Sequence, residues 1–218
     1  LAGLAPTVIP HGVAAPTRED PFVERSGDGA FVIAHFGFLL RDKGIAEVIE
    51  AVAALRARGE ERVRYHVLGA VGDGEASRAT YRELVRLVRR HHLNDAVELV
   101  PSFQPLDQSL RTLRRADWIV LNYQSGSAQG TSGAVRHALA SGRPVAVSPA
   151  SIFDDVREAV HTLQGPLPDA LSALMATPAL ATETQARAHA FREAHAWPSV
   201  ARLHRELYER VVDGTKNR

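Results

Sequence analysis

The sequence predicts an α/β fold in which helices cover a parallel sheet. From Phe31 onward, short β-branched runs alternate with longer segments of helical period, which is typical of a Rossmann-like domain. The expected strands are almost continuously apolar, as parallel strands buried on both faces are. Five strands are expected, at residues 31–35, 64–68, 97–100, 118–121 and 144–147.

The segments between these strands have the spacing of amphipathic helices. Apolar residues recur three and four positions apart from Ile45 to Leu55 and again from Tyr81 to Val88, so each helix should turn one apolar stripe toward the sheet. After the last strand only helical patterns remain, separated by Pro178 and by Trp197-Pro198. These last helices are expected at residues 170–175, 183–195 and 199–212.

The composition is that of one ordinary globular domain. The chain has 218 residues, of which 45% are hydrophobic, and no polar linker or repeat divides it. The formal charge of +1 gives no large field of one sign, so net charge does not indicate a nucleic-acid partner, and none is expected. The basic residues at 78–92 and 111–115 have the spacing of solvated helix faces.

The sequence also allows expectations about the cellular location of the protein and about whether the chain is part of a longer one. Cysteine is absent, which excludes disulfides and thiolate chemistry and favours a cytoplasmic location. No apolar run is long enough to span a bilayer. Because the chain opens on Leu1, we expect it to be a piece of a longer protein.

Candidate binding residues lie in the loops that follow the strands, because ligands of open parallel sheets bind at the carboxyl ends of the strands. In the loop at residues 35–44, Gly37 permits close backbone approach and Lys43 can place a charge against a phosphate. The alternative is a surface turn with a solvated lysine.

A second loop, at residues 125–133, has three glycines and four hydroxyl side chains before a helix expected at 134–140. It could cradle an anion, with Ser132 or Thr131 capping the helix, or it could be a flexible loop. A third loop, at 69–74, lacks the spacing of a dinucleotide fingerprint.

Other kinds of site are excluded or disfavoured. There is no P-loop motif, and Ala134 breaks the nucleophile-elbow pattern of serine hydrolases. The ten histidines are scattered without metal-ligand spacing, so no metal site is expected.

The order of motifs resembles the carboxyl-terminal domain of family 4 retaining glycosyltransferases, which have the two-domain GT-B fold. The likeness covers nearly the whole chain. The segment 37–44 is similar to the family's Gly-Arg-Leu-x-x-x-Lys-Gly loop, and 138–145 is similar to its Ala-Met-Ala-x-Gly-x-Pro-Val. Weaker likenesses lie at residues 8–13, 66–74, 94–103 and 197–208.

The resemblance implies that residues 1–218 form a single donor-binding domain, the carboxyl-terminal half of a GT-B fold, and that the amino-terminal acceptor domain is absent from this chain. Its partners would be a nucleotide-diphosphate sugar and a glycan or lipid acceptor, with no cofactor and no metal. The full-length protein would work in the cytoplasm or at the inner face of the membrane.

The resemblance also implies roles for individual residues. Gly37, Lys43, Ser132, Gly133 and Ala134 would bind the diphosphate; Gln129, Gly130, Thr131 and His137 the sugar and ribose; Pro101, Ser102 and Phe103 the base. No catalytic residue is assigned.

The chain departs from the family at charged positions. The family's loop arginine falls on Phe38, and its two glutamates fall on Gln129 and His137. Asp154 and Asp155 lie where the family carries an acidic residue, and capping a short helix is their expected job.

Two other functions stay open. The domain could be a degenerate, non-catalytic binding or scaffolding module, which would have no nucleotide affinity. A sugar-nucleotide epimerase or a phosphorylase of the same architecture would need a catalytic acid or a cofactor lysine that the sequence does not reveal.

Overall fold

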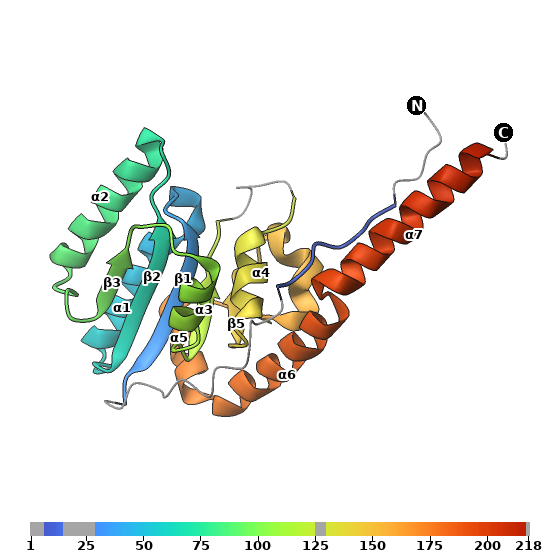
Figure 1. Cartoon of the computed structure of the whole chain (residues 1–218). Coiled ribbons are helices and arrows are strands. Elements are labelled where there is room, and N and C mark those ends of the chain that lie inside the picture. The colour runs from blue at the N-terminus through green and yellow to red at the C-terminus, as the bar shows by residue number, and fades with distance from the viewer. Residues whose placement is uncertain (1–6, 15–28, 125–129, 217–218) are drawn as a thin grey trace.

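The strands of the described sheet all run parallel, in the order β3-β2-β1-β4-β5-β6. The computed structural model describes residues 7–14, 29–124 and 130–216 (Figure 1). The predicted α/β class is therefore confirmed. The strands are β1 (Phe31–Phe38), β2 (Val63–Ala70), β3 (Val97–Val100), β4 (Trp118–Leu121), β5 (Val145–Val147) and β6 (His161–Thr162).

Each expected strand is present, and β6 was missed because two residues are too few to show a sequence pattern. The helices also follow the predicted order. They are α1 (Ile45–Ala57), α2 (Glu75–Arg90), α3 (Leu106–Leu113), α4 (Gly133–Ala140), α5 (Leu167–Ala176), α6 (Pro178–Ala194) and α7 (Trp197–Lys216), with 3-10 helices η1 (Arg41–Lys43) and η2 (Ser151–Ala159). Pro178 and Pro198 lie in the first turns of α6 and α7, where proline's missing N–H costs nothing.

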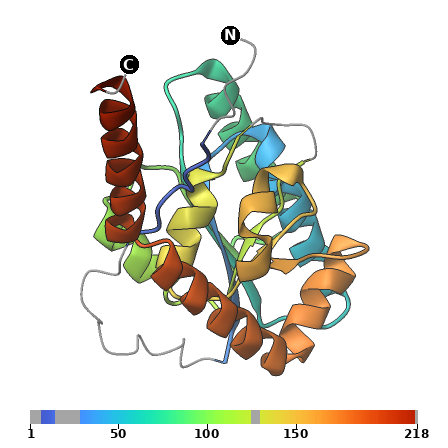
Figure 2. The same cartoon turned by 90° about the vertical axis from the view of Figure 1, so that its right-hand side faces the viewer.

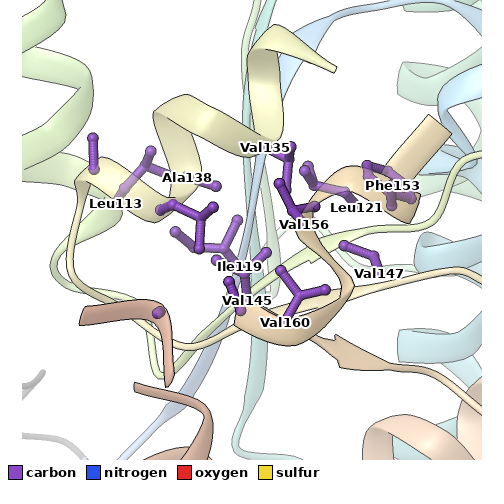
Figure 3. Close-up of a cluster of buried hydrophobic side chains, with 14 of the residues drawn as sticks. Leu113, Ile119, Leu121, Val135, Ala138, Val145, Val147, Phe153, Val156 and Val160 are labelled. Carbon is purple, nitrogen blue, oxygen red and sulfur yellow. The ribbon is translucent and has the colours of Figure 1, made fainter. Parts of the chain in front are cut away.

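The sheet has a hydrophobic core on each face. On one side α1, α2 and α5 pack against residues such as Ile33 and Val120, and on the other α3, α4, η2 and α6 pack against Val32 and Ile119. Successive strand residues thus alternate between the two cores, as the period of a strand requires. Figure 3 shows the second core, in which Ile119 and Leu121 of β4 meet side chains of α4 and η2.

The strand order reverses between β1 and β4, which lie side by side at the centre of the sheet. The chain leaves these two neighbouring strands toward opposite edges of the sheet. The loops that follow them therefore lie on either side of one crevice. The loop after β1 contains Lys43, and the loop after β4 leads to α4. The topology therefore brings the two best candidate loops together, although 90 residues separate Lys43 from Gly133.

Helix α7 extends away from the rest of the domain beyond the end of α6 (Figures 1 and 2). The junction of α6 and α7 is anchored: the Val13 amide donates to the carbonyl of His195, the C-cap of α6, at 2.8 Å, and a Cβ on Gly12 would lie 2.5 Å from the Trp197 ring at the start of α7. None of the helices in the described ranges has the length and apolarity needed to cross a bilayer.

Candidate functional site

A cavity of about 510 Å³ opens at the carboxyl ends of β1, β2 and β4. It collects side chains from the loops after β1, β3 and β4 and from the start of α4. Its lining residues are Phe36, Gly37, Phe38, Lys43, Leu68, Ala70, Ser102, Phe103, Gln104, Tyr123, Thr131, Ser132, Gly133, Ala134 and Ile152.

The loop after β1 is held against the loop after β4 by a close backbone approach. Gly44 has φ of 65°, and a Cβ there would lie 1.7 Å from the carbonyl oxygen of Asn122. The backbone amide of Gln124 also donates to the backbone carbonyl of Asp42 at 2.9 Å. Only glycine can therefore link η1 to α1 here, and this contact sets the distance between Lys43 and the opposite wall.

Lys43 supplies the positive charge of the cavity. Among the described lining residues it is the one with a charged side chain, and that side chain is 15% exposed. Its Nζ lies 4.0 Å from the centroid of the Tyr123 ring and 3.1 Å from Oδ2 of Asp42. The ammonium group is held near the cavity floor rather than extended into solvent.

The start of α4 forms the facing wall. Ser132 is the N-cap of this helix, and its Oγ accepts a hydrogen bond from the Val135 amide at 3.3 Å. Of the two capping residues left open by the sequence, Ser132 is thus the one used. Gly133 and Ala134 follow in the first turn, where backbone amides lack intrahelical acceptors and the helix dipole favours an anion.

Gly37 lies between these two walls. Its φ of 146° is in the region that favours glycine. A Cβ added there would lie 3.7 Å from Cβ of Ala134 and from the Tyr123 hydroxyl oxygen. Because Gly37 has no side chain, the space above its backbone in the cavity stays open. A ligand can therefore approach the backbone there closely.

The remaining wall is apolar and aromatic. Phe38 and Phe103 line the cavity although they are 55% and 80% exposed. Ser102 and Gln104 flank Phe103 in the same loop, and sequence reasoning missed Gln104. Pro101 does not line the cavity; its carbonyl accepts a hydrogen bond from the Val71 amide at 3.0 Å and so fixes the start of the loop.

His137, the expected ribose contact, lies outside the cavity lining. Its Nε2 is 2.7 Å from Oγ of Ser109, and its ring stacks on Phe36 with centroids 3.9 Å apart. Burial lowers the pKa of His137, so the neutral ring is favoured. Gly130 also lies outside the lining, with φ of 118°, and the predicted contact Gln129 falls outside the described residues.

The structure contradicts a capping role for Asp154 and Asp155. Both lie inside η2, which begins at Ser151 after Ala150. Asp155 instead forms an ion pair with Arg136 of α4, whose side chain is 4% exposed, and Asp154 pairs with Arg157 at 3.0 Å. The sequence could not reveal the first pair because it joins two helices across the core.

Two buried polar side chains were also missed: Tyr123 lines the cavity, and His35 lies next to its lining residue Gly37. His35 of β1 is fully buried, and a Cβ on Gly37 would lie 3.7 Å from its Nε2. Tyr123 is 4% exposed. Neither residue carries a motif, so only the fold places them at the site.

The comparisons with known proteins agree with this geometry. A sequence model of the family described as glycosyl transferases group 1 matches residues 30–184. This chain belongs to that family. The resemblance to glycosyltransferases is therefore confirmed. A search of curated protein sequences found no match.

Solved structures show that the fold is that of one GT-B domain. Sucrose-phosphate synthase from Thermosynechococcus elongatus aligns with a TM-score of 0.70 and 19% identity, over 85% of this chain and 46% of that chain. HepE from Anabaena, in a complex with UDP, aligns with a TM-score of 0.68 and 15% identity, over 84% and 49%. The C-terminal domain of LpcC, a glycosyl transferase group 1 family protein from Francisella tularensis, gives 0.60 and 18%, over 72% and 82%.

The extent of these alignments matters for function. This glycosyltransferase chain spans less than half the length of the synthase and of HepE. An activity of either whole protein therefore comes to this chain only as a proposal.

Proposed function

We propose that this chain is the donor-binding domain of a glycosyltransferase, and that its cavity binds a nucleoside-diphosphate sugar. The observation that carries the proposal is the convergence of Lys43 with the start of α4 in one cavity. A compact ammonium and a set of helix N-terminal amides are complementary to a diphosphate. The relative HepE, whose structures contain UDP and UDP-glucose, supports this choice of ligand class.

The same arrangement suits the chemistry of glycosyl transfer. Negative charge grows on the diphosphate as the bond to the sugar breaks. Fixed positive charge and oriented amides at that place stabilise the developing charge without reorganisation. We propose that Lys43, Ser132, Gly133 and Ala134 have this role and that the sugar is transferred with retention of configuration.

The aromatic wall suits the other end of the ligand. Phe103 presents a largely exposed ring to the cavity, next to the polar side chains of Ser102 and Gln104. An aromatic face can stack on a planar base, and the polar neighbours can bond to its edge. We propose that the base lies at this wall, with Thr131 and Gly130 nearer the sugar.

A second domain would bind the acceptor, which we propose to be a glycan or a lipid. Helix α7 projects from the body (Figure 1). Its side chains Trp197, Leu203 and Tyr208 are 47%, 37% and 62% exposed. Large exposed apolar side chains on one element are typical of an interaction surface. The half-length alignments to the synthase and HepE support a second domain as its partner.

A thermal-shift experiment tests the donor site. Wild-type protein is heated with UDP, ADP or GDP, and a ligand present at a hundred times its Kd should stabilise the fold by about 2.7 kcal/mol. For a chain of this size that raises Tm by about 5–10 °C. Lys43→Ala should remove most of the rise, because Lys43 is the cation of the described cavity lining.

Arg41→Ala is the matched control. Arg41 lies two residues away in η1, but its side chain is 79% exposed and pairs with Glu83 at 3.0 Å outside the cavity. It should keep the full rise in Tm. If no diphosphate shifts Tm at millimolar concentration, or if Lys43→Ala shifts like the wild type, the proposed donor site is wrong.

A non-catalytic binding module is the second candidate. It is favoured by Phe38, which stands where the family has an arginine, and by the hydrogen bond that keeps His137 on Ser109. This alternative predicts no nucleotide affinity, so the same experiment separates the two functions.

A further inference from the structure

Tyr123 lines the cavity from the loop after β4, with its backbone and ring both fixed. Its carbonyl accepts a hydrogen bond from Oγ of Ser148 at 2.6 Å, and its ring packs on Phe153 with centroids 4.9 Å apart. The residue is 4% exposed. Because the residue is tightly packed, its ring has little freedom to move and can keep groups that contact it in place.

Different parts of this phenol touch both anion-binding elements. The ring face carries Nζ of Lys43 at 4.0 Å from its centroid. The hydroxyl group interacts with the side chain of Ser132, the N-cap of α4, and this interaction opposes the rise in its pKa. Lys43 and Ser132 come from loops far apart in the sequence, and Tyr123 interacts with both.

The lysine has particular need of such support. A lysine side chain has four rotatable bonds and loses close to 2 kcal/mol of rotamer entropy when it is fixed. An aromatic face contributes about 0.5–2 kcal/mol to holding an ammonium group when the pair is removed from water. Asp42 holds the ammonium from a second side, at 3.1 Å.

The use of lysine here stands out in this sequence. The chain has 26 basic residues, and only Lys43 and Lys216 are lysines; the rest are arginines. The cavity thus contains a residue type that the chain otherwise almost never uses. A compact ammonium can lie over one ring and against one phosphate oxygen as a point charge, whereas a guanidinium binds as a planar fork.

We propose that Tyr123 is a positioning residue that holds the Lys43 ammonium over its ring and the α4 N-cap through its hydroxyl group, so that both elements present a fixed spacing to a diphosphate. The inference rests on the proposed donor-binding function. Burial raises the pKa of Tyr123 to about 12, so the hydroxyl group stays protonated at neutral pH. The ring never brings a negative charge to the site under those conditions.

The first test is a magnetic-resonance measurement on the protein without ligand. Protein labelled with ¹³C-lysine gives side-chain signals from two residues only, and Lys43→Arg identifies which belong to Lys43. An ammonium held over the ring face places the neighbouring ε-protons in the ring current, so the Lys43 signals should be shifted upfield of those of Lys216. Tyr123→Phe should keep the shift, and Tyr123→Leu should remove it.

The second test is calorimetry with UDP, ADP and GDP, using whichever binds the wild type most tightly. Tyr123→Leu should weaken binding about tenfold, which corresponds to the loss of one desolvated cation–π contact. In Lys43→Ala the same tyrosine change should have much less effect, because residues that act as a unit are not additive. Tyr65→Phe is the control, since Tyr65 is buried in the other core and should bind normally.

The outcomes separate this inference from the function on which it rests. If the wild type binds no diphosphate, the proposed function fails, whatever the lysine signals show. If the wild type binds but its Lys43 signals are not shifted upfield, the positioning role of Tyr123 is wrong. The same holds if Tyr123→Leu binds as tightly as the wild type. The first measurement needs only the wild type and Lys43→Arg, so a failure of Tyr123→Leu to fold would not rescue the idea.

Discussion

The buried imidazole of His35 should make the fold sensitive to mild acid. Burial lowers the pKa of His35 from 6.5 to about 4, with the Val120 backbone opposing the shift and Lys43 adding to it. Neither ring nitrogen has a hydrogen bond of good geometry that would stabilise the charged ring. In the unfolded chain the same ring becomes protonated near its ordinary pKa.

The sign and size follow from proton linkage. Between pH 6.5 and pH 4 the unfolded state binds a proton that the folded state does not, so the free energy of unfolding falls as the pH is lowered. A pKa lowered from 6.5 to about 4 corresponds to about 3 kcal/mol, present in full above pH 6.5 and lost by pH 4.

The assay is urea unfolding followed by the fluorescence of the buried Trp118 at several pH values from 7 to 4. His35→Leu removes the titrating ring, so its stability should fall by about 3 kcal/mol less than that of the wild type over this range. Other histidines with lowered pKa values, such as His137, are present in both proteins and cancel in the comparison.

An exposed histidine provides the control. The His189 side chain is 62% exposed on α6, and His189→Gln should leave the dependence on pH as it is in the wild type. Parallel loss of stability in the wild type and His35→Leu would refute the reasoning, because it would mean that His35 becomes protonated without unfolding the chain.

Two further substitutions test the framework of the site. Both Gly44 and Gly59 have a positive φ, but only at Gly44 would an added Cβ clash with the backbone after β4. In chemical denaturation, Gly44→Ala should therefore lower the free energy of unfolding by at least about 2 kcal/mol more than Gly59→Ala does. Equal losses would contradict the close contact. Asp155→Asn leaves the buried charge of Arg136 without its partner and should cost about 3 kcal/mol, whereas Asp154→Asn in the same helix should cost less than about 1 kcal/mol. Equal unfolding midpoints for these two variants would show that the buried pair does not stabilise the fold.

Several features of the site could be predicted because they depend on short stretches of sequence. Strands β3 and β4 have the expected bounds, since β4 is apolar and buried at every position and β3 is apolar at all positions but Glu98. Ser132 was one of two expected caps, because capping involves residues three apart. Lys43 and Gly37 were found because a loop after a parallel strand is where ligands bind.

What only the tertiary structure decided depends on residues far apart in the chain. Whether Lys43 faces α4 or solvent is settled by the packing of Gly44 against the loop after β4. His137 carries no sequence sign that it bonds to Ser109, and Tyr123 none that it lies under Lys43.

The physical reason is the range of the forces. Hydrophobic periodicity, capping and turn conformation act within a few residues, so the sequence by itself determined the class of fold, the order of its elements and the loops that could bind an anion. Side-chain partners across the sheet are chosen by the close packing of distant segments. That packing brought Lys43, Tyr123 and the start of α4 into one cavity.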